Sequence, residues 1–363
     1  MKKGIAVTAT LVLVAGITYL VKKKYTKKKE PTFSAQSSSG RVNYNVAPDC
    51  VTVEDPRYDT LYGSDPSDDC GPLACARHTL AVSKHLTDDQ IPTSKDNDSA
   101  IGNLESCLRQ HVGGTTLIVG HGMQGKIDTA LGTALYDDWY LSANNHQSWA
   151  SAFSRLKQYK SPEITLWGCS TGSESKGTDL LRDIKNDLCP GSNVCASSIK
   201  SPKVPVFCDD SGLYFMDGEQ WNYGNGGSAP DGTLTRVTPS AGEPMRAESS
   251  GTQDQALSEE YSAKQFSKIL WEQNGEEFHR LTSLEEKNSF LTEIDFSHKI
   301  ETTGCPVSRK IGTAELHPWN GNRRFFVMYA NGFVRDLSRT DMKVYYQASD
   351  ALINTWMNLL LPH

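Results

Sequence analysis

The fold expected for this chain is decided by two stretches, Thr115-Thr116-Leu117-Ile118-Val119-Gly120-His121-Gly122 and Glu163-Ile164-Thr165-Leu166-Trp167-Gly168-Cys169-Ser170-Thr171-Gly172. Each stretch has the pattern of a buried strand that ends at a glycine. Reacting groups in open α/β sheets collect at the carboxyl ends of the strands, so His121 and Cys169 are expected at the same edge of one sheet. This arrangement is typical of a cysteine–histidine catalytic dyad.

The residue types fit that chemistry. A thiol with an ordinary pKa of about 8.5 is mostly protonated at neutral pH, so a nucleophilic Cys169 needs an imidazole such as that of His121 as general base. Attack on an amide builds negative charge on the carbonyl oxygen, and backbone N–H groups stabilise that charge where no side chain blocks the approach. The backbone amides of Gly122 and Cys169 are the predicted oxyanion donors.

Apolar residues at helical spacing surround the two strands and predict three helices. The sets are Ile101, Leu104, Leu108 and Val112; Trp149, Phe153 and Leu156; and Leu180, Leu181, Ile184 and Leu188. Strands that alternate with helices of this length predict an α/β fold with a mostly parallel sheet. Residues 213–216 and 220–223 flank Asp217-Gly218, which predicts a β-hairpin.

The two strand ends resemble a known family. Cys169 follows His121 by 48 residues, and a glycine stands just past the cysteine, as in caspases. The chain is therefore similar to the clan CD, caspase-like cysteine peptidases, which include caspases, legumain, gingipains and separase. Residues 101–223 carry the resemblance, and within them 177–184 and 193–198 resemble bacterial caspase-like domains. The chain departs from the caspase signature Gln-Ala-Cys-x-Gly, because Trp167 replaces the glutamine and the glycine comes one residue later.

The resemblance implies a three-layer caspase-like core and a substrate pocket beside the nucleophile strand. Trp167 and the segment 195–198, with Ser197 and Ser198, are expected in the walls of that pocket. Asp209 or Asp210 is expected at its mouth, where a carboxylate would favour a basic residue before the cleaved bond. Asp209-Asp210-Ser211-Gly212 is equally an ordinary turn sequence.

Two other functional classes remain open. A caspase-like module that has lost its activity would bind peptides or act as a scaffold. Gly120-His121-Gly122-Met123-Gln124-Gly125 also resembles the G-x-S-x-G elbow of α/β-hydrolases, but Gly122 stands at the serine position and supplies no nucleophile. A degenerate α/β-hydrolase is therefore the minor alternative to a cysteine endopeptidase that forms a thioester acyl-enzyme.

Composition predicts more than one domain. The expected parts are a membrane anchor with its lysine-rich flank (1–30), a cysteine-containing segment (31–95), the α/β core (96–224), a flexible linker (225–256) and a smaller α+β domain (257–363). The linker is rich in Gly, Ser, Pro and Thr. In the last part we expect a helix with Ala263, Phe266, Ile269 and Leu270, a hairpin over 325–337, and a final helix with Leu352, Trp356, Leu359 and Leu360.

Residues 4–21 are 18 uncharged, largely apolar residues, long enough for a single-pass membrane anchor. A cleaved signal peptide is the rival, although no A-x-A-like exit follows. Two lysines precede the segment and six follow it, which by the positive-inside rule would leave the body in the cytoplasm. The nine cysteines favour export, since eight could pair if Cys169 stays free. Reduced structural cysteines are an equally ordinary interpretation.

Charge argues against nucleic acid as a partner. Residues 1–30 hold eight basic side chains and one acidic, which leaves 29 basic against 42 acidic and a net charge of −13 for the rest. A peptide or protein substrate is the expected partner. His279, His298 and His317 lack metal-ligand spacing, and the sequence predicts neither a metal nor a cofactor.

Overall fold

The structure is a computed structural model that describes residues 41–44, 47–60, 71–129, 140–189, 198–216, 218–224, 260–273, 276–338 and 343–358. The described residues belong to one compact unit. The predicted anchor (4–21) and linker (225–256) lie outside them, and the predicted domain boundaries stay predictions. Among the described segments, no helix is both long enough and apolar enough to cross a bilayer.

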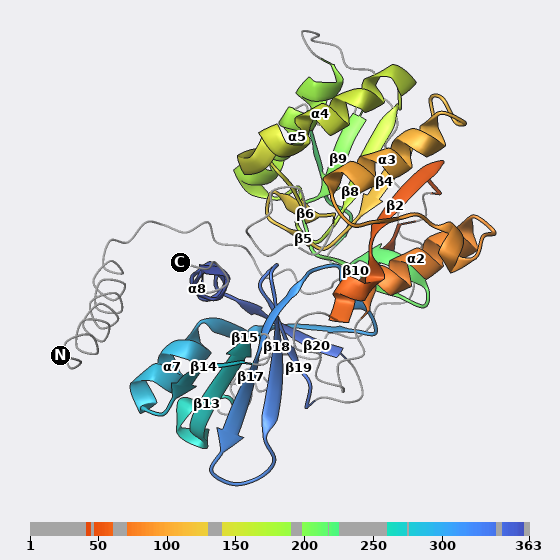
Figure 1. Ribbon diagram of the computed structural model, residues 1–363. Coiled ribbons are helices and arrows are strands. Elements are labelled where there is room, and N and C mark those ends of the chain that lie inside the picture. The colour runs from red at the N-terminus through yellow and green to blue at the C-terminus, as the bar shows by residue number, and fades with distance from the viewer. Residues whose placement is uncertain are drawn as a thin grey trace, which may run out of the picture. The chain divides into compact units, whose positions relative to one another are not determined.

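A six-stranded sheet holds both of the stretches that open the sequence analysis (Figure 1). Its order is β12 (Trp221–Tyr223), β9 (Ser198–Pro202), β8 (Glu163–Trp167), β4 (Thr116–Val119), β2 (Cys50–Glu54) and β3 (Thr93–Ser94). β4 lies parallel to β8, with Val119 opposite Trp167. Because the two strands end at the same level, the residues that follow them start from one edge of the sheet.

Helices cover one face of this sheet, as Figure 1 shows. They are α3 (Asn97–Leu108), α4 (His146–Ser154) and α5 (Glu174–Leu188). Asp96 begins α3 by accepting a hydrogen bond from the Ser99 amide at 2.6 Å, which satisfies one of the free N–H groups at the helix start. Ile101 of α3, Phe153 of α4 and Ile184 of α5 are fully buried in one hydrophobic cluster with the strands. Amphipathic periodicity thus predicts these three helices, and the prediction is confirmed except at two ends. Val112 lies past α3 and is exposed, and Leu156 lies in the 3₁₀ helix Arg155–Tyr159 after α4.

The opposite face is covered by α2 (Pro72–Ser83) and by a four-stranded antiparallel sheet. That sheet has the order β1 (Val42–Asn43), β11 (Gly212–Phe215), β10 (Val206–Asp209) and β16 (Cys305–Pro306). Cys75 of α2 forms a disulfide with Cys208 of β10, and Cys50 forms one with Cys107 of α3. Disulfides hold Cys189 and Cys305 as well. Cys169 is the free cysteine of the described part of the chain.

A three-stranded antiparallel sheet follows His121 directly. It contains β5 (Gly122–Met123), β6 (Lys126–Asp128) and β7 (Tyr140–Ser142). The amide of Asp128 donates to the carbonyl of His121 at 2.8 Å, so the hairpin folds back onto the end of β4. This fold-back brings the Asp128 side chain to the edge of the larger sheet.

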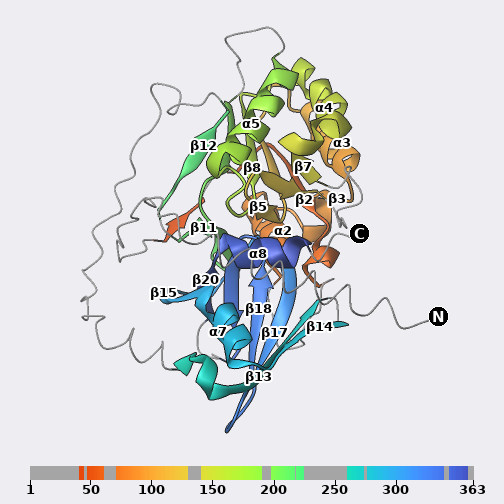
Figure 2. The same cartoon turned by 90° about the vertical axis from the view of Figure 1, so that its left-hand side faces the viewer.

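The C-terminal half is built on a seven-stranded antiparallel sheet (Figure 2). Its order is β14 (Glu276–Leu281), β13 (Phe266–Gln273), β17 (Lys310–Pro318), β18 (Arg324–Tyr329), β19 (Phe333–Asp336), β20 (Lys343–Ala348) and β15 (Ile294–Thr302). Helices α7 (Leu284–Thr292) and α8 (Asp350–Asn358) contribute Phe290, Leu291, Leu352 and Ile353 to the hydrophobic cluster of this sheet.

The predicted fold class, a three-layer caspase-like core with a mostly parallel sheet, is wrong. Twelve of the sixteen strand pairings in the described residues are antiparallel, and the four parallel ones all lie in the six-stranded sheet. The chain is a mixed α/β protein with mainly antiparallel sheets. The prediction generalised from two strands, whereas most other strands follow each other closely in sequence and pair antiparallel.

Two local predictions are also wrong. Residues 213–216 and 220–223 do not form a hairpin, because β11 pairs with β10 and β1 whereas β12 pairs with β9 in another sheet. The apolar residues of 266–270 belong to strand β13, and a short apolar run does not separate a buried strand from a helix. The predicted hairpin around Asn331-Gly332 is confirmed by the pairing of β18 with β19, and α8 confirms the final helix as far as Asn358.

Candidate functional site

His121 and Cys169 both lie at the carboxyl edge of the six-stranded sheet, one residue past the glycine that follows each strand. The amide of Gly120 donates to the carbonyl of Trp167 at 3.2 Å, so the two chains stay together beyond the last ladder pair. Both side chains are buried. No hydrogen bond joins them in this form, since each makes its contacts with other groups.

His121 lies between two carboxylates. Its Nδ1 contacts Glu54 Oε2 at 2.9 Å, its Nε2 lies 3.3 Å from Asp59 Oδ1, and its backbone amide also donates to Glu54 Oε2. Burial alone would lower the pKa of the imidazole, but the charges and hydrogen bonds of Glu54 and Asp59 outweigh it and raise the pKa to about 9. His121 is therefore an imidazolium at neutral pH and donates from both ring nitrogens.

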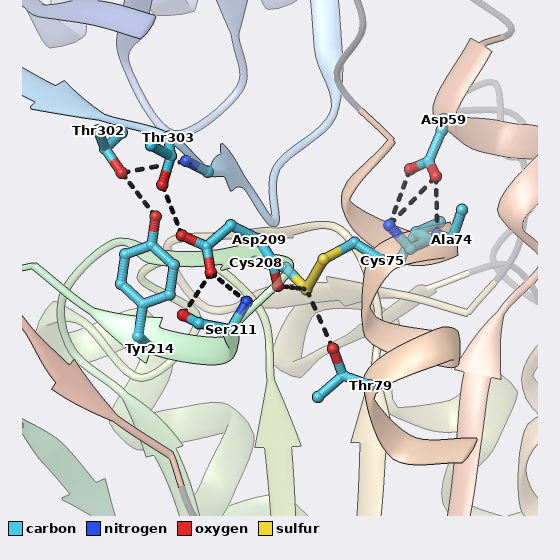
Figure 3. Close-up of a disulfide and its surroundings, with 12 residues drawn as sticks. Asp59, Ala74, Cys75, Thr79, Cys208, Asp209, Ser211, Tyr214, Thr302 and Thr303 are labelled. Carbon is cyan, nitrogen blue, oxygen red and sulfur yellow. Dashed lines mark hydrogen bonds between the residues drawn. A yellow bond between two sulfur atoms is a disulfide. The ribbon is translucent and has the colours of Figure 1, made fainter. Parts of the chain in front are cut away.

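Asp59 is itself held in place by the start of α2. Its carboxylate accepts the backbone N–H groups of Leu73 and Ala74 at 3.1 and 3.0 Å, as Figure 3 shows. The first N–H groups of a helix have no partner within the helix, and an anion at that position is stabilised by them. One carboxylate thus connects the helix N-terminus with the imidazolium.

The Cys169 thiol is fully buried against the backbone of β10. It donates to the Val206 carbonyl at 3.0 Å, and the Val206 amide lies 3.3 Å from the sulfur. Burial raises the pKa of the thiol to about 12, even though nearby backbone hydrogen bonds act in the opposite direction. In this form the thiol stays protonated and is not a nucleophile.

The two predicted oxyanion donors converge on one oxygen atom. The amides of Gly122 and Cys169 donate to the carbonyl of Val307 at 3.0 and 3.1 Å. The amide of Val307 donates to the Val206 carbonyl at 2.9 Å, the same oxygen that accepts the thiol proton. Val307 therefore lies against Cys169 with its carbonyl in the position that the sequence assigns to a substrate.

Glycine is required where these backbones meet. A Cβ atom on Gly122 would lie 2.4 Å from the amide nitrogen of Cys169, and one on Gly120 would lie 1.9 Å from the carbonyl oxygen of Asp128. Ser170, next to the cysteine, has a φ of 54°, a left-handed conformation that non-glycine residues seldom adopt. Such conformations gather at functional sites, because the surrounding structure must hold them there.

Arg309, two residues after Val307, forms ion pairs with two carboxylates. Its guanidinium lies 2.9 Å from Asp128 Oδ2 and 3.7 Å from Glu54 Oε1. The Glu54 side chain is fully buried, and Arg309 is 13% exposed, so little water screens these charges. Glu54 thus contacts His121 through one oxygen and faces Arg309 with the other.

Of the residues predicted to form the pocket, only Trp167 shares a hydrophobic cluster with Cys169 in the described residues. Trp167 is fully buried, with its ring centroid 4.3 Å from that of Tyr44 and 5.0 Å from that of Phe215, so it packs in the core. Ser198 stands opposite Glu163, at the end of β8 remote from Cys169, because β9 runs parallel to β8. Ser197 lies outside the described residues.

Asp209 is already neutralised by a neighbour. It accepts two hydrogen bonds from Arg41 at 2.7 and 2.9 Å. It also accepts from Thr303 and Ser211, as Figure 3 shows. Burial opposes ionisation, but these hydrogen bonds together hold the pKa of Asp209 well below its usual range. Asp209 and Asp210 begin the β10–β11 turn and border a cavity of about 630 Å³ that also contacts Cys305. The turn interpretation of this sequence is confirmed.

Sequence reasoning missed five residues of this site: Glu54, Asp59, Asp128, Val307 and Arg309. Glu54 is the last residue of a third strand, β2, which ends at the same edge as β4, and Asp59 follows this strand. The signal was present, because Cys50-Val51-Thr52-Val53-Glu54 is an apolar run that ends in a carboxylate. Val307 and Arg309 carry no local signal, since their role depends on a contact with residues far away in sequence.

The His121 cluster predicts how stability depends on pH. A pKa of about 9 in the folded protein, against 6.5 for a free histidine, means that the cluster stabilises the fold fully below pH 6.5. That contribution, about 3 kcal/mol, is lost as the pH rises through 9. Urea unfolding at pH 6.5 and pH 9 should show this loss in the wild type and much less of it in His121→Gln.

A histidine outside the site provides the control. His146 contacts Asp187 at 2.9 Å, and His146→Gln is measured beside His121→Gln for comparison. Equal slopes in wild type and His121→Gln would show that the imidazolium does not carry the effect.

Comparisons with known proteins add no further assignment: no family model, curated protein or solved structure matches the chain.

Proposed function

We propose that this protein is a cysteine endopeptidase held in a latent form by its own residues 305–309. The observation that carries the proposal is the pair of amides on Gly122 and Cys169, which converge on the carbonyl of Val307. Two convergent N–H donors beside a cysteine can stabilise the negative charge on the oxygen of a tetrahedral intermediate by hydrogen bonds. Cys169 is the proposed nucleophile, and His121 is the proposed proton donor to the leaving amine and then the base toward water.

The proposed reaction uses groups that this site contains. Once the site opens, the Cys169 thiol gives its proton to solvent, and the thiolate that forms beside the His121 imidazolium attacks the carbonyl carbon of a substrate whose oxygen takes the position of the Val307 oxygen. The peptide C–N bond then breaks, the leaving amine takes a proton from His121, and water hydrolyses the thioester. Glu54 would orient the imidazole through Nδ1 and stabilise its positive charge.

The site is latent because His121 and Cys169 each contact other groups of the chain. His121 Nε2 faces Asp59, and the Cys169 thiol donates to Val206, so proton transfer between the two needs a rearrangement. Val307 also fills the position that a substrate carbonyl would take. Displacement of residues 305–309 would open the amide pair and expose the thiol to solvent.

The disulfides bear on where this activity would operate. Cysteines 50, 75, 107, 189, 208 and 305 are disulfide-bonded, which favours an oxidising compartment. We propose that the body of the protein lies outside the cytoplasm, attached to the membrane by residues 4–21.

A non-catalytic peptide-binding module is the second candidate. The imidazole bound between Glu54 and Asp59 and the protonated thiol favour this candidate, because neither group can act as base or nucleophile in this arrangement. Such a module would use the same amides to hold a peptide carbonyl without cleaving the chain.

Arg309→Ala tests the choice between the two. Loss of the ion pairs to Asp128 and Glu54 should loosen the segment and raise hydrolysis of a mixed peptide library by roughly tenfold or more over the wild type. Alkylation of Cys169 by iodoacetamide at pH 7.5, measured by mass spectrometry, should rise in parallel. Arg323→Ala is the matched control, since Arg323 pairs with Glu315 at the surface.

Adding Cys169→Ala or His121→Ala to the Arg309→Ala variant should abolish the hydrolysis. Peptide binding without any hydrolysis that depends on Cys169 would support the binding module and end the peptidase proposal.

A further inference from the structure

Residues 305–307 lie in the site as an extended strand. Cys305 pairs with Cys208 and Pro306 with Phe207 in an antiparallel ladder, and the Val307 amide continues it to Val206. An extended peptide added to the edge of β10 would make the same backbone bonds. The chain's own segment therefore shows the register in which a peptide fits beside Cys169.

Val307 fixes the position of the reacting carbonyl in that register. Its side chain is fully buried in the hydrophobic cluster that contains Val53, Leu73 and Trp167. An apolar side chain thus fits at the position whose carbonyl the amides hold.

The counter-charges lie two residues further on. Asp128 reaches the site on β6 because the β5–β6 hairpin folds back onto His121, and Glu54 comes from the end of β2. Asp128 uses Oδ2 for Arg309, whereas its Oδ1 lies 3.5 Å from Lys126. Glu54 Oε1 is fully buried and has no hydrogen-bond partner in the described residues, so it faces Arg309 as an unsatisfied acceptor.

We infer that Glu54 and Asp128 form a subsite for a guanidinium side chain two residues after the residue whose carbonyl is held by Gly122 and Cys169. The substrate class is an extended peptide with an aliphatic residue at the held carbonyl and an arginine two positions later. This inference rests on the proposed function for cleavage but not for binding.

Two observations point to a ligand subsite here. The acidic pair comes from β2 and from the β5–β6 hairpin that follows β4, whereas its cation lies on a separate segment whose Val307 carbonyl also accepts from the two amides. In addition, a buried carboxylate oxygen without a hydrogen-bond donor is costly, and a fork-shaped guanidinium can satisfy it together with the second carboxylate.

The test uses the full chain with Cys169→Ala and Arg309→Ala, which vacates the subsite and prevents cleavage. Methylguanidinium at up to 10 mM should raise the melting temperature of this protein by about 3 °C, with sodium chloride at equal ionic strength as the reference. The same addition should have no effect on Cys169→Ala with Arg323→Ala. Adding Asp128→Asn to the vacated variant should remove the rise.

A second arm uses the Arg309→Ala protein with Cys169 intact and a library of ten-residue peptides. Sequenced products should show a basic residue at the second position after the cleaved bond, with arginine at least about tenfold above glutamine. Asp128→Asn should reduce that preference.

The outcomes separate the two proposals. A rise with methylguanidinium but no cleavage would keep the subsite and end the peptidase proposal. Cleavage without a basic preference at that position, or no rise with methylguanidinium, would overturn the subsite and leave the peptidase. Should Arg309→Ala fail to fold, Arg309→Gln takes its place in the peptide arm, where the loss of the guanidinium charge weakens the hold of Glu54 and Asp128 on the segment.

Discussion

The Glu54→Gln variant will lose about 3 to 5 kcal/mol of its free energy of unfolding at pH 7, the usual cost of breaking a buried ion pair from one side. Glu54 is fully buried and contacts His121 Nδ1 at 2.9 Å, with Arg309 3.7 Å from its other oxygen. Gln keeps the size of the side chain but removes its negative charge. The variant therefore leaves two cations near a neutral group, and urea unfolding measures the cost.

Glu163→Gln is the matched control. Glu163 pairs with Lys200 at 2.9 Å, but its carboxylate is 27% exposed, so solvent screens the pair. Its loss should cost less than about 1 kcal/mol. Equal losses in the two variants would show that Glu54 does not hold the site together.

A double variant separates the two partners of Glu54. If Arg309 depends on Glu54, then Glu54→Gln with Arg309→Gln will cost less than the sum of the single variants, by about 0.5 to 3 kcal/mol. If the costs of the two single variants add up to the cost of the double variant, Arg309 is held by Asp128 and not by Glu54.

Glu54 also shows which parts of the site can be predicted from the sequence and which cannot. The strands that precede His121 and Cys169 are visible in the sequence because each is an apolar run that stops at a glycine. Their neighbouring positions and the two amides follow from that pattern, since parallel strands that end together place the next residues at one edge. The structure pairs Val119 with Trp167 accordingly.

Partners from distant parts of the chain are not visible in this way. Asp59 reaches His121 because a 3₁₀ turn at Pro56–Thr60 brings it to the start of α2, and no periodicity encodes that contact. Arg309 arrives after a chain of antiparallel strands in the C-terminal half. The apolar residues of 266–270 also satisfy a helical spacing, yet antiparallel pairing with β14 and β17 makes them a strand. Tertiary pairing overrides local spacing there.

Gly122→Ala will destabilise the protein by about 2 to 4 kcal/mol and remove its ability to hold a peptide carbonyl, because overpacking against backbone cannot be relieved by a rotamer change. The added Cβ would lie 2.4 Å from both the amide nitrogen of Cys169 and the carbonyl carbon of Gly168. Either β5 moves away from the end of β8 or the end of β8 moves. In both cases the two amides no longer converge on one oxygen.

Gly102→Ala is the control, and it should raise the free energy of unfolding where Gly122→Ala lowers it. Gly102 lies within α3, and a Cβ there would meet nothing within 4 Å. Alanine at a helix position should stabilise the protein by about 0.5 to 1 kcal/mol, since glycine loses more backbone entropy on folding. Urea unfolding of both variants gives the stabilities, and peptide hydrolysis in the Arg309→Ala background gives the function. A Gly122→Ala protein that is as stable and as active as its parent would show that the close approach of these two strand ends does not build the site.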